Sequence, residues 1–150
     1  MNNQEIMKVA LEEAEIAVSE GNAPFACVVV DGEGKVVLRE HDRVKELMDP
    51  TAHGEVNAIR RLCKQLNTLS LNGYAFYTTS EPCPTCLTSM IKAKVSKNYY
   101  GAKTEGTASL PISAEFLASK SLKYPIIVTG GVLAEEALEQ RERLLKLELN

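Results

Sequence analysis

Apolar residues recur at helical spacing in three long segments of the chain. These segments predict helices over 4–20, 52–66 and 132–148, and Thr51 is placed to cap the second. A proline directly after Cys83 favours the start of another helix there, because the first turn of a helix has no intrahelical acceptor for an N–H. The side chains expected to be buried are Ile6, Val9, Ala10, Ala14, Ala17 and Val18 in the first helix and Val56, Ile59, Cys63 and Leu66 in the second.

Short apolar runs bounded by turn residues lie between these helices and predict strands. Residues 25–30 and 35–40 flank the turn Asp31-Gly32-Glu33-Gly34, which indicates a hairpin. Alternating strands and helices predict an α/β fold, with helices packed on both faces of one sheet as an α/β/α sandwich. No repeat or linker is evident, so 1–150 is expected to form a single domain. The further elements expected are strands over 74–79, 97–100 and 126–129, a short helix over 113–118, and irregular structure over 41–50.

Composition narrows the class of protein. Of 150 residues, 45% are hydrophobic and 25% charged, and no apolar run approaches the roughly 18 residues that span a bilayer, so we expect no membrane partner. The acidic, amphipathic first 20 residues do not resemble a secretory signal, which predicts a cytoplasmic protein with reduced thiols. The net charge of −3 disfavours a general nucleic-acid binder. Four lysines leave two alternatives open, a basic patch or a solvated face: Lys92, Lys94, Lys97 and Lys103.

The residues with the clearest chemistry form a split motif, His53-Gly54-Glu55 followed by Pro82-Cys83-Pro84-Thr85-Cys86. One imidazole and two thiols supply three of the four positions around a tetrahedral zinc ion and leave the fourth for water, as in catalytic sites. Cys83 and Cys86 are one helical turn apart, at a helix start that favours thiolates. His53 and Glu55 are two residues apart, so they converge only near a helix end. We therefore predict one Zn²⁺ per subunit, held by His53, Cys83 and Cys86.

Glu55 is the predicted catalytic residue. Zinc lowers the pKa of bound water, but two thiolates offset the charge of the ion, so a base is needed nearby. We expect Glu55 to take the proton as hydroxide attacks an amidine carbon, and to deliver it to the ring nitrogen and the departing amine. Taken alone, Cys-x-x-Cys also fits a redox pair or half of a structural zinc site. The remaining cysteines, Cys27 and Cys63, are expected to act as small hydrophobic residues.

The segment 49–59 together with 79–86 resembles the cytidine and deoxycytidylate deaminase superfamily, whose zinc nucleobase deaminases carry H-x-E and P-C-x-x-C. Within it the chain is most similar to the branch of guanine deaminase, fungal-type cytosine deaminase and tRNA adenosine deaminase. Segments 24–30 and 129–136 extend the resemblance. It implies a cytidine deaminase-like fold with a central mixed five-stranded sheet, a homodimer, and a substrate site that includes Phe25, Ala26, Asp42 and Ser80.

Two positions depart from the pattern of this branch. Asp42 stands where an asparagine usually hydrogen-bonds the base, and an ionised aspartate only accepts, so the expected base edge is richer in N–H groups. If the alignment slips by one residue, Asp42 is instead a solvated loop residue. His41 is expected to face solvent rather than to stack on a base. Ala26 stands where glycine is frequent, and its methyl group narrows the approach to the backbone.

Three functions are compatible with these residues. The leading hypothesis is hydrolytic deamination of a free nucleobase or related amino-heterocycle, with release of ammonia. The alternative is deamination of adenosine in tRNA, favoured by segment 129–136 and the lysines. Against it stand the negative net charge and a last helix in which basic residues alternate with glutamates. A non-enzymatic, zinc-stabilised interaction module is the third, and it predicts that Glu55 is dispensable.

Overall fold

A five-stranded sheet lies at the centre of the computed structural model, which describes residues 1–104 and 110–149. The strand order is β2-β1-β3-β4-β5. β1 pairs antiparallel with β2 and β3, whereas β3, β4 and β5 run parallel. The sheet is therefore mixed, as the resemblance implied. The strands are β1 (Ala26–Val30), β2 (Val36–His41), β3 (Ala75–Ser80), β4 (Lys97–Ala102) and β5 (Ile127–Thr129).

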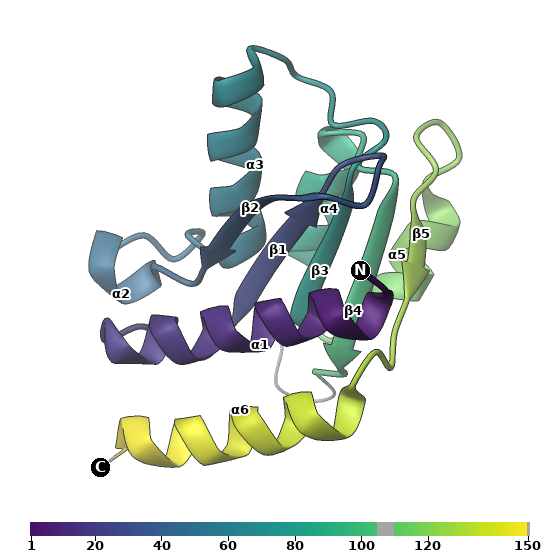
Figure 1. Cartoon of the computed structure of the whole chain (residues 1–150). Coiled ribbons are helices and arrows are strands. Elements are labelled where there is room, and N and C mark those ends of the chain that lie inside the picture. Colours follow the sequence, from purple (N-terminus) through teal and green to yellow (C-terminus); the bar gives the residue numbers. More distant parts are fainter. Residues whose placement is uncertain (105–109, 150) are drawn as a thin grey trace.

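Helices cover both faces of the sheet, which confirms the predicted α/β/α sandwich (Figure 1). α1 and α6 pack on one face and α3 and α4 on the other, with α5 beside β5. Among the described residues, no helix has the length and apolar character needed to cross a membrane. The helices are α1 (Asn3–Ser19), α2 (Val44–Leu47), α3 (Gly54–Leu66), α4 (Pro84–Lys92), α5 (Ala114–Lys120) and α6 (Ala134–Leu149).

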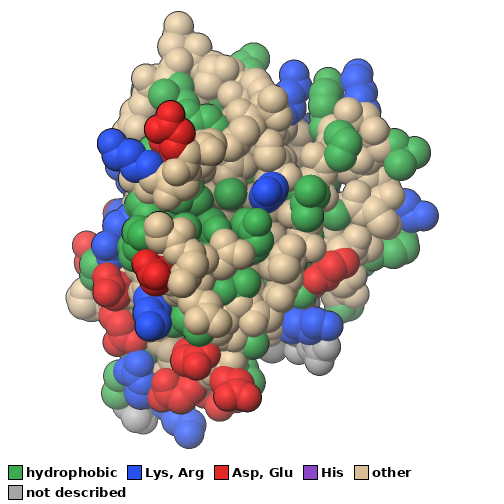
Figure 2. Space-filling model, turned by 45° about the vertical axis from the view of Figure 1, so that its right-hand side comes forward, with side chains coloured by type: hydrophobic (Ala, Val, Ile, Leu, Met, Phe, Trp, Pro, Cys, Tyr) green, Lys and Arg blue, Asp and Glu red, His purple; other side chains and the backbone are tan. Residues whose placement is uncertain are grey.

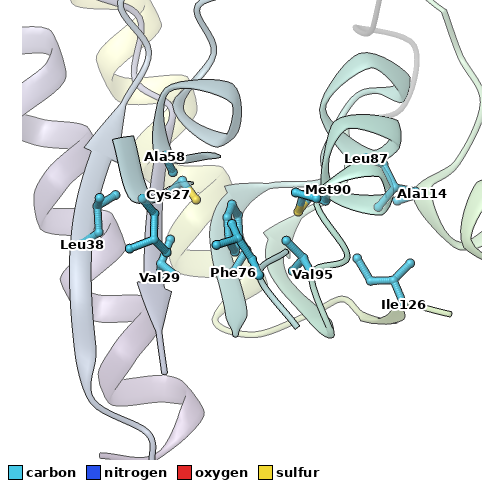
Figure 3. Packing of buried hydrophobic residues seen from close by; sticks show 13 residues of the cluster. Cys27, Val29, Leu38, Ala58, Phe76, Leu87, Met90, Val95, Ala114 and Ile126 are labelled. Carbon is cyan, nitrogen blue, oxygen red and sulfur yellow. The ribbon is translucent and has the colours of Figure 1, made fainter. Parts of the chain in front are cut away.

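Two hydrophobic clusters join these layers because successive strand residues point to opposite faces. Phe76 lies in the cluster under α3 and α4, and its neighbour Tyr77 lies in the cluster under α1. Figure 3 shows Phe76 in the middle of the first cluster, with Val29 on one side and Met90 and Val95 on the other. Cys27 is fully buried there, in agreement with the prediction that it acts as a small hydrophobic residue.

The start and end of α3 differ from the prediction. The helix begins at Gly54 with His53 at its N-cap, while the Thr51 hydroxyl donates to Asp49 Oδ1 at 2.7 Å, so Thr51 is not the cap. Leu66 was predicted to be buried, but it is 45% exposed. Leu66 is the last helical residue, and this end of α3 projects beyond β1 and β2 in Figure 1.

The segment 41–50, expected to be irregular, contains the end of β2 and the short helix α2. A helix of one turn is too short to produce a periodic pattern. His41, expected to face solvent, is 1% exposed. Its Nδ1 lies 2.6 Å from Glu13 Oε2, and its Nε2 lies 2.9 Å from Glu20 Oε2. The carboxylates of Glu13 in α1 and of Glu20, the C-cap residue of this helix, compensate the burial of the ring. The sequence did not indicate these contacts, because the two glutamates lie 28 and 21 positions before His41 in the chain.

Candidate active site

The N-termini of α3 and α4 bring the split motif together. His53 and Cys83 occupy the two N-cap positions, and Cys86 lies in the first turn of α4. His53 Nδ1 lies 3.1 Å from Cys86 Sγ and 3.7 Å from Cys83 Sγ, and the two sulfurs are 3.5 Å apart. Two ligands that each lie about 2.0–2.3 Å from a tetrahedral zinc ion are about 3.5–3.8 Å apart. The separations of 3.5 and 3.7 Å match this range and the third, 3.1 Å, is shorter, so a small movement of the His53 and Cys86 side chains lets this donor set hold one zinc ion.

Within the described residues, this group has three protein donors and no fourth histidine, cysteine or carboxylate. A structural zinc site is closed by four protein ligands, whereas a catalytic site keeps one position open. Three donors therefore match a catalytic site better than a closed structural one.

The electrostatics of the three donors favour a metal-ligating thiolate. The hydrogen bond between the two thiols lowers the pKa of Cys83 to about 4 and raises the pKa of Cys86. The hydrogen bond to Cys83 raises the pKa of His53 to about 9, although burial of the ring opposes this shift. A thiolate next to a cationic imidazole is the form from which a metal ion displaces the remaining protons.

Glu55 lies in the first turn of α3, two residues after His53, and is 8% exposed. Burial raises the pKa of its carboxyl group above the ordinary value. A carboxyl group with a raised pKa gains and loses a proton more readily near neutral pH, which suits general acid–base catalysis.

A cavity of about 300 Å³ opens beside His53 and Glu55. All four residues that the resemblance assigned to the substrate line it: Phe25, Ala26, Asp42 and Ser80. The Asp42 amide donates to the Phe25 carbonyl oxygen at 2.9 Å, so the end of β2 and the start of β1 form one wall. Asp42 is 5% exposed, so the alternative of a solvated loop residue is wrong. Burial also raises the pKa of its carboxyl group.

The cavity contains residues that the sequence analysis did not single out, namely Thr78, Thr79, Glu81 and Thr104. The Glu81 carboxylate accepts from the Thr104 amide at 3.2 Å and from the Ala114 amide at 3.0 Å. Glu81 therefore links Thr104, which lies just after β4, and Ala114, the first residue of α5, to the edge of the cavity. The sequence could have indicated the β3 residues as part of the site, because side chains at the carboxyl ends of parallel strands line ligand sites in open α/β sheets.

Known proteins resemble this chain in sequence and fold. Residues 1–102 match the cytidine and deoxycytidylate deaminase zinc-binding region. The tRNA-specific adenosine deaminase of Aquifex aeolicus is 38% identical over 102 residues, which cover 68% of this chain and 67% of that protein. The guanine deaminase of Bacillus subtilis is 34% identical over 118 residues, covering 78% and 75% of the two chains.

Among solved structures, one from a study of A-to-I editing by tRNA:A34 deaminases superimposes with a TM-score of 0.80 at 31% identity. The match covers 89% of this chain and 96% of that one. The likeness therefore extends beyond residues 1–102, the part of the chain that matches the zinc-binding region.

Proposed function

We propose that this zinc-dependent deaminase, which belongs to the cytidine and deoxycytidylate deaminase zinc-binding family, acts on an adenine base in tRNA. The observation that carries the chemistry is the grouping of His53, Cys83 and Cys86 beside Glu55 at an open cavity. The choice of substrate is supported by the tRNA-specific adenosine deaminases among the relatives. It replaces the free nucleobase as the leading hypothesis.

The roles of the residues follow from their positions. His53, Cys83 and Cys86 would hold the zinc ion, which activates a water molecule for attack on an electron-poor carbon. Glu55 would accept a proton from that water and give it to the adjacent ring nitrogen. Once the C–O bond has formed, Glu55 would take the second proton from the added hydroxyl group and give it to the amine, so that the C–N bond breaks, ammonia leaves and the oxygen becomes a carbonyl oxygen. The product is the hydroxy or oxo form of the base.

A second candidate is a free base of the guanine type, and Asp42 is the observation that favours it. An ionised carboxylate accepts hydrogen bonds, and guanine presents a ring N–H on its pairing edge, next to the amino group that deamination removes. The distribution of surface charge also favours a small free base over tRNA. Figure 2 shows the Lys and Arg side chains of one face scattered among apolar and acidic ones rather than gathered into a continuous basic surface.

Of the two alternatives left open for the four lysines, a basic patch or a solvated face, the basic patch does not form as one cluster. Lys92, Lys94 and Lys97 lie at the end of α4 and the start of β4, whereas Lys103 follows the far end of that strand. A strand of six residues spans roughly 20 Å, so these charges lie at opposite ends of the sheet.

Release of ammonia from a panel of substrates separates the two candidates. The panel contains an anticodon stem-loop with one adenosine, the same stem-loop with guanosine in its place, and free adenine, guanine and cytosine. We expect the adenosine stem-loop to have the highest kcat/KM. Turnover of guanine without turnover of the stem-loop would refute the tRNA proposal and favour the second candidate.

Substitution of Asp42 tests its role as the base reader. Asp42→Asn adds a donor, so it is expected to lower kcat/KM for guanine relative to adenine by about tenfold, the cost of one mismatched buried hydrogen bond. Asp31→Asn, in the hairpin turn remote from the cavity, is the matched control. Equal proportional changes on every substrate would show that Asp42 does not read the base.

A further inference from the structure

Arg141 of α6 is a half-buried cation that forms no ion pair with a carboxylate among residues 1–104 and 110–149. Its Nη1 donates to the Lys103 carbonyl oxygen at 2.8 Å, and its Nη2 donates to Ser80 Oγ at 2.7 Å and to the Ala102 carbonyl oxygen at 3.1 Å. Each of these acceptors is neutral. Burial of a guanidinium group without a counter-ion is unfavourable. A neutral side chain could link the ends of the two strands at a lower cost in free energy. The contact with Ser80 suggests what else this side chain does.

Arg143, two residues further along α6, provides a contrast. It is exposed and pairs with Glu15 at 2.8 Å and with Glu139 at 3.2 Å. Such pairs are ordinary for the surface of a helix and contribute little. The two arginines thus have the same charge on the same helix, but only Arg141 contacts a residue that lines the cavity.

The hydrogen bond from Arg141 determines whether the Ser80 hydroxyl group acts as a donor or as an acceptor toward the cavity. A hydroxyl group has one proton to donate and accepts through its lone pairs. Ser80 Oγ accepts from Arg141, and its own proton has no acceptor among the residues that the structure describes. Ser80 lines the cavity together with Asp42 and Glu55. A charged donor also polarises the hydroxyl group and strengthens it as a donor in turn.

We infer that Ser80 is a hydrogen-bond donor to an acceptor atom of the bound base, and that Arg141 is the positioning residue that fixes it in this role. The inference rests on the proposed function insofar as the ligand is a purine. The complementary group on the ligand is a ring nitrogen or carbonyl oxygen. Ser80 and Asp42 then divide the task of recognition, because the hydroxyl group donates where the carboxylate accepts.

Four variants test the roles of the two residues. Ser80→Ala and Arg141→Gln are each expected to raise KM about three- to tenfold with little change in kcat or zinc content, because one hydrogen bond to the ligand is lost or weakened. Arg141→Lys is expected to restore part of the loss. Arg143→Gln removes the same charge from the same helix and is expected to leave KM unchanged.

The double variant separates positioning from a purely structural role. If Arg141 acts through Ser80, Arg141→Gln causes little further increase in KM in a protein that already carries Ser80→Ala. A purely structural role predicts instead that the fold increases in KM of the two substitutions multiply. A loss of the same size in both backgrounds would overturn the role of Arg141. Its effect on Tm, measured in parallel, reports the bonds to the Ala102 and Lys103 carbonyl groups.

Deaza analogues identify the acceptor atom. We expect Ser80→Ala to have no effect on KM for the analogue in which a carbon replaces the contacted ring nitrogen, either 3-deaza or 7-deaza. The same variants are measured with the adenosine stem-loop and with guanine, and calorimetric binding of purine to the zinc-loaded protein gives a readout without turnover. If the adenosine stem-loop is not a substrate but the variants change KM for guanine as expected, the tRNA proposal is rejected and the inference about Ser80 stands. Unchanged affinity of Ser80→Ala for every ligand would overturn the inference.

Discussion

The chemistry of the site depends on a few side chains at defined positions near the N-termini of two helices. His53 and Cys83 stand at the N-caps of α3 and α4 without making side-chain caps of their own, so their donor atoms are available to a metal ion. Cys86 and Glu55 follow within the first turns. All four side chains therefore project from helix starts, where side chains two or three residues apart still reach one point.

Glu55→Gln is the direct test of the proton-transfer role. The variant is expected to retain the fold and its zinc but to lose about 10²–10⁴ in kcat, the usual contribution of a positioned acid–base group. Steady-state kinetics and metal analysis measure the two effects on one preparation. Near-normal turnover of the variant would reject Glu55 as the proton carrier, whereas no turnover in wild type on any substrate of the panel would favour the non-enzymatic zinc module.

Cys83→Ala is expected to lose both zinc and activity, because two remaining protein donors hold the ion poorly. Cys63→Ala is the matched control, since Cys63 is a partly buried thiol that packs against the core outside the zinc group. Zinc content and ammonia release should fall together in the first variant and stay normal in the second. Activity in metal-free Cys83→Ala protein would contradict the role of zinc.

Secondary-structure elements are joined near the site by buried polar groups as well as by apolar packing. Glu40 of β2 accepts hydrogen bonds from Arg61 of α3 and from Arg43, which precedes α2, at 2.9 and 2.7 Å. At the opposite side, Gly101 of β4 lies against Ala137 of α6. Both contacts determine how closely a helix approaches the sheet, and both are testable by one substitution.

Glu40→Gln is expected to destabilise the fold by about 1.5–3 kcal/mol at pH 7, the range for hydrogen bonds to charged groups. Burial raises the pKa of Glu40, but hydrogen bonds from the His41 amide, Arg61 and Arg43 outweigh it and the pKa is lowered. Its stabilisation is therefore present above the ordinary value of 4.5 and is lost as pH falls from 4.5 through the lower pKa of the folded state.

Urea unfolding of both proteins between pH 7 and pH 3 measures this effect. The difference in unfolding free energy between wild type and Glu40→Gln should shrink at the acidic end. Glu33→Gln, an exposed substitution in the hairpin turn, should show a small difference throughout. A constant difference across the pH range would show that Glu40 does not supply the acid sensitivity.

Gly101→Ala is expected to destabilise the protein by about 1–3 kcal/mol, the usual cost of overpacking. An added Cβ would lie 2.7 Å from the Thr79 carbonyl oxygen and 2.8 Å from the Ala137 Cβ, so α6 must move away from the sheet. Gly32→Ala is the control, because its nearest neighbour would be the Gly73 carbonyl oxygen at 3.8 Å. Equal unfolding midpoints for the two variants would contradict this packing.

For the whole molecule, the zinc group links α3 to α4 across one face of the sheet, and the two helices come from different halves of the sequence. A metal ion that binds the folded state but not the unfolded chain stabilises the fold by mass action. Two features of the whole chain stay predictions from the sequence: the homodimer, which sedimentation equilibrium tests, and the single domain over 1–150, which cooperative unfolding tests.

Removal of zinc is expected to lower Tm by about 10 °C. Zinc at about a thousand times its Kd contributes about 4 kcal/mol, and 1 kcal/mol shifts Tm by about 2–4 °C for a chain of this size. Differential scanning calorimetry with and without a chelator measures the shift. Cys83→Ala provides the control, since its Tm should not respond to the chelator; a response equal to that of wild type would place the relevant metal elsewhere.

The amino-acid sequence by itself determined the long helices, the hairpin, the layered sheet and the association of His53, Cys83, Cys86 and Glu55. These features depend on local spacing: an apolar period defines a buried face, and side chains within one turn share a direction. Only the tertiary structure decided the burial of His41 and Asp42 and the exposure of Leu66. It also brought Arg141 to Ser80, 61 residues away, because periodicity shows which face of an element is buried but not which element covers it.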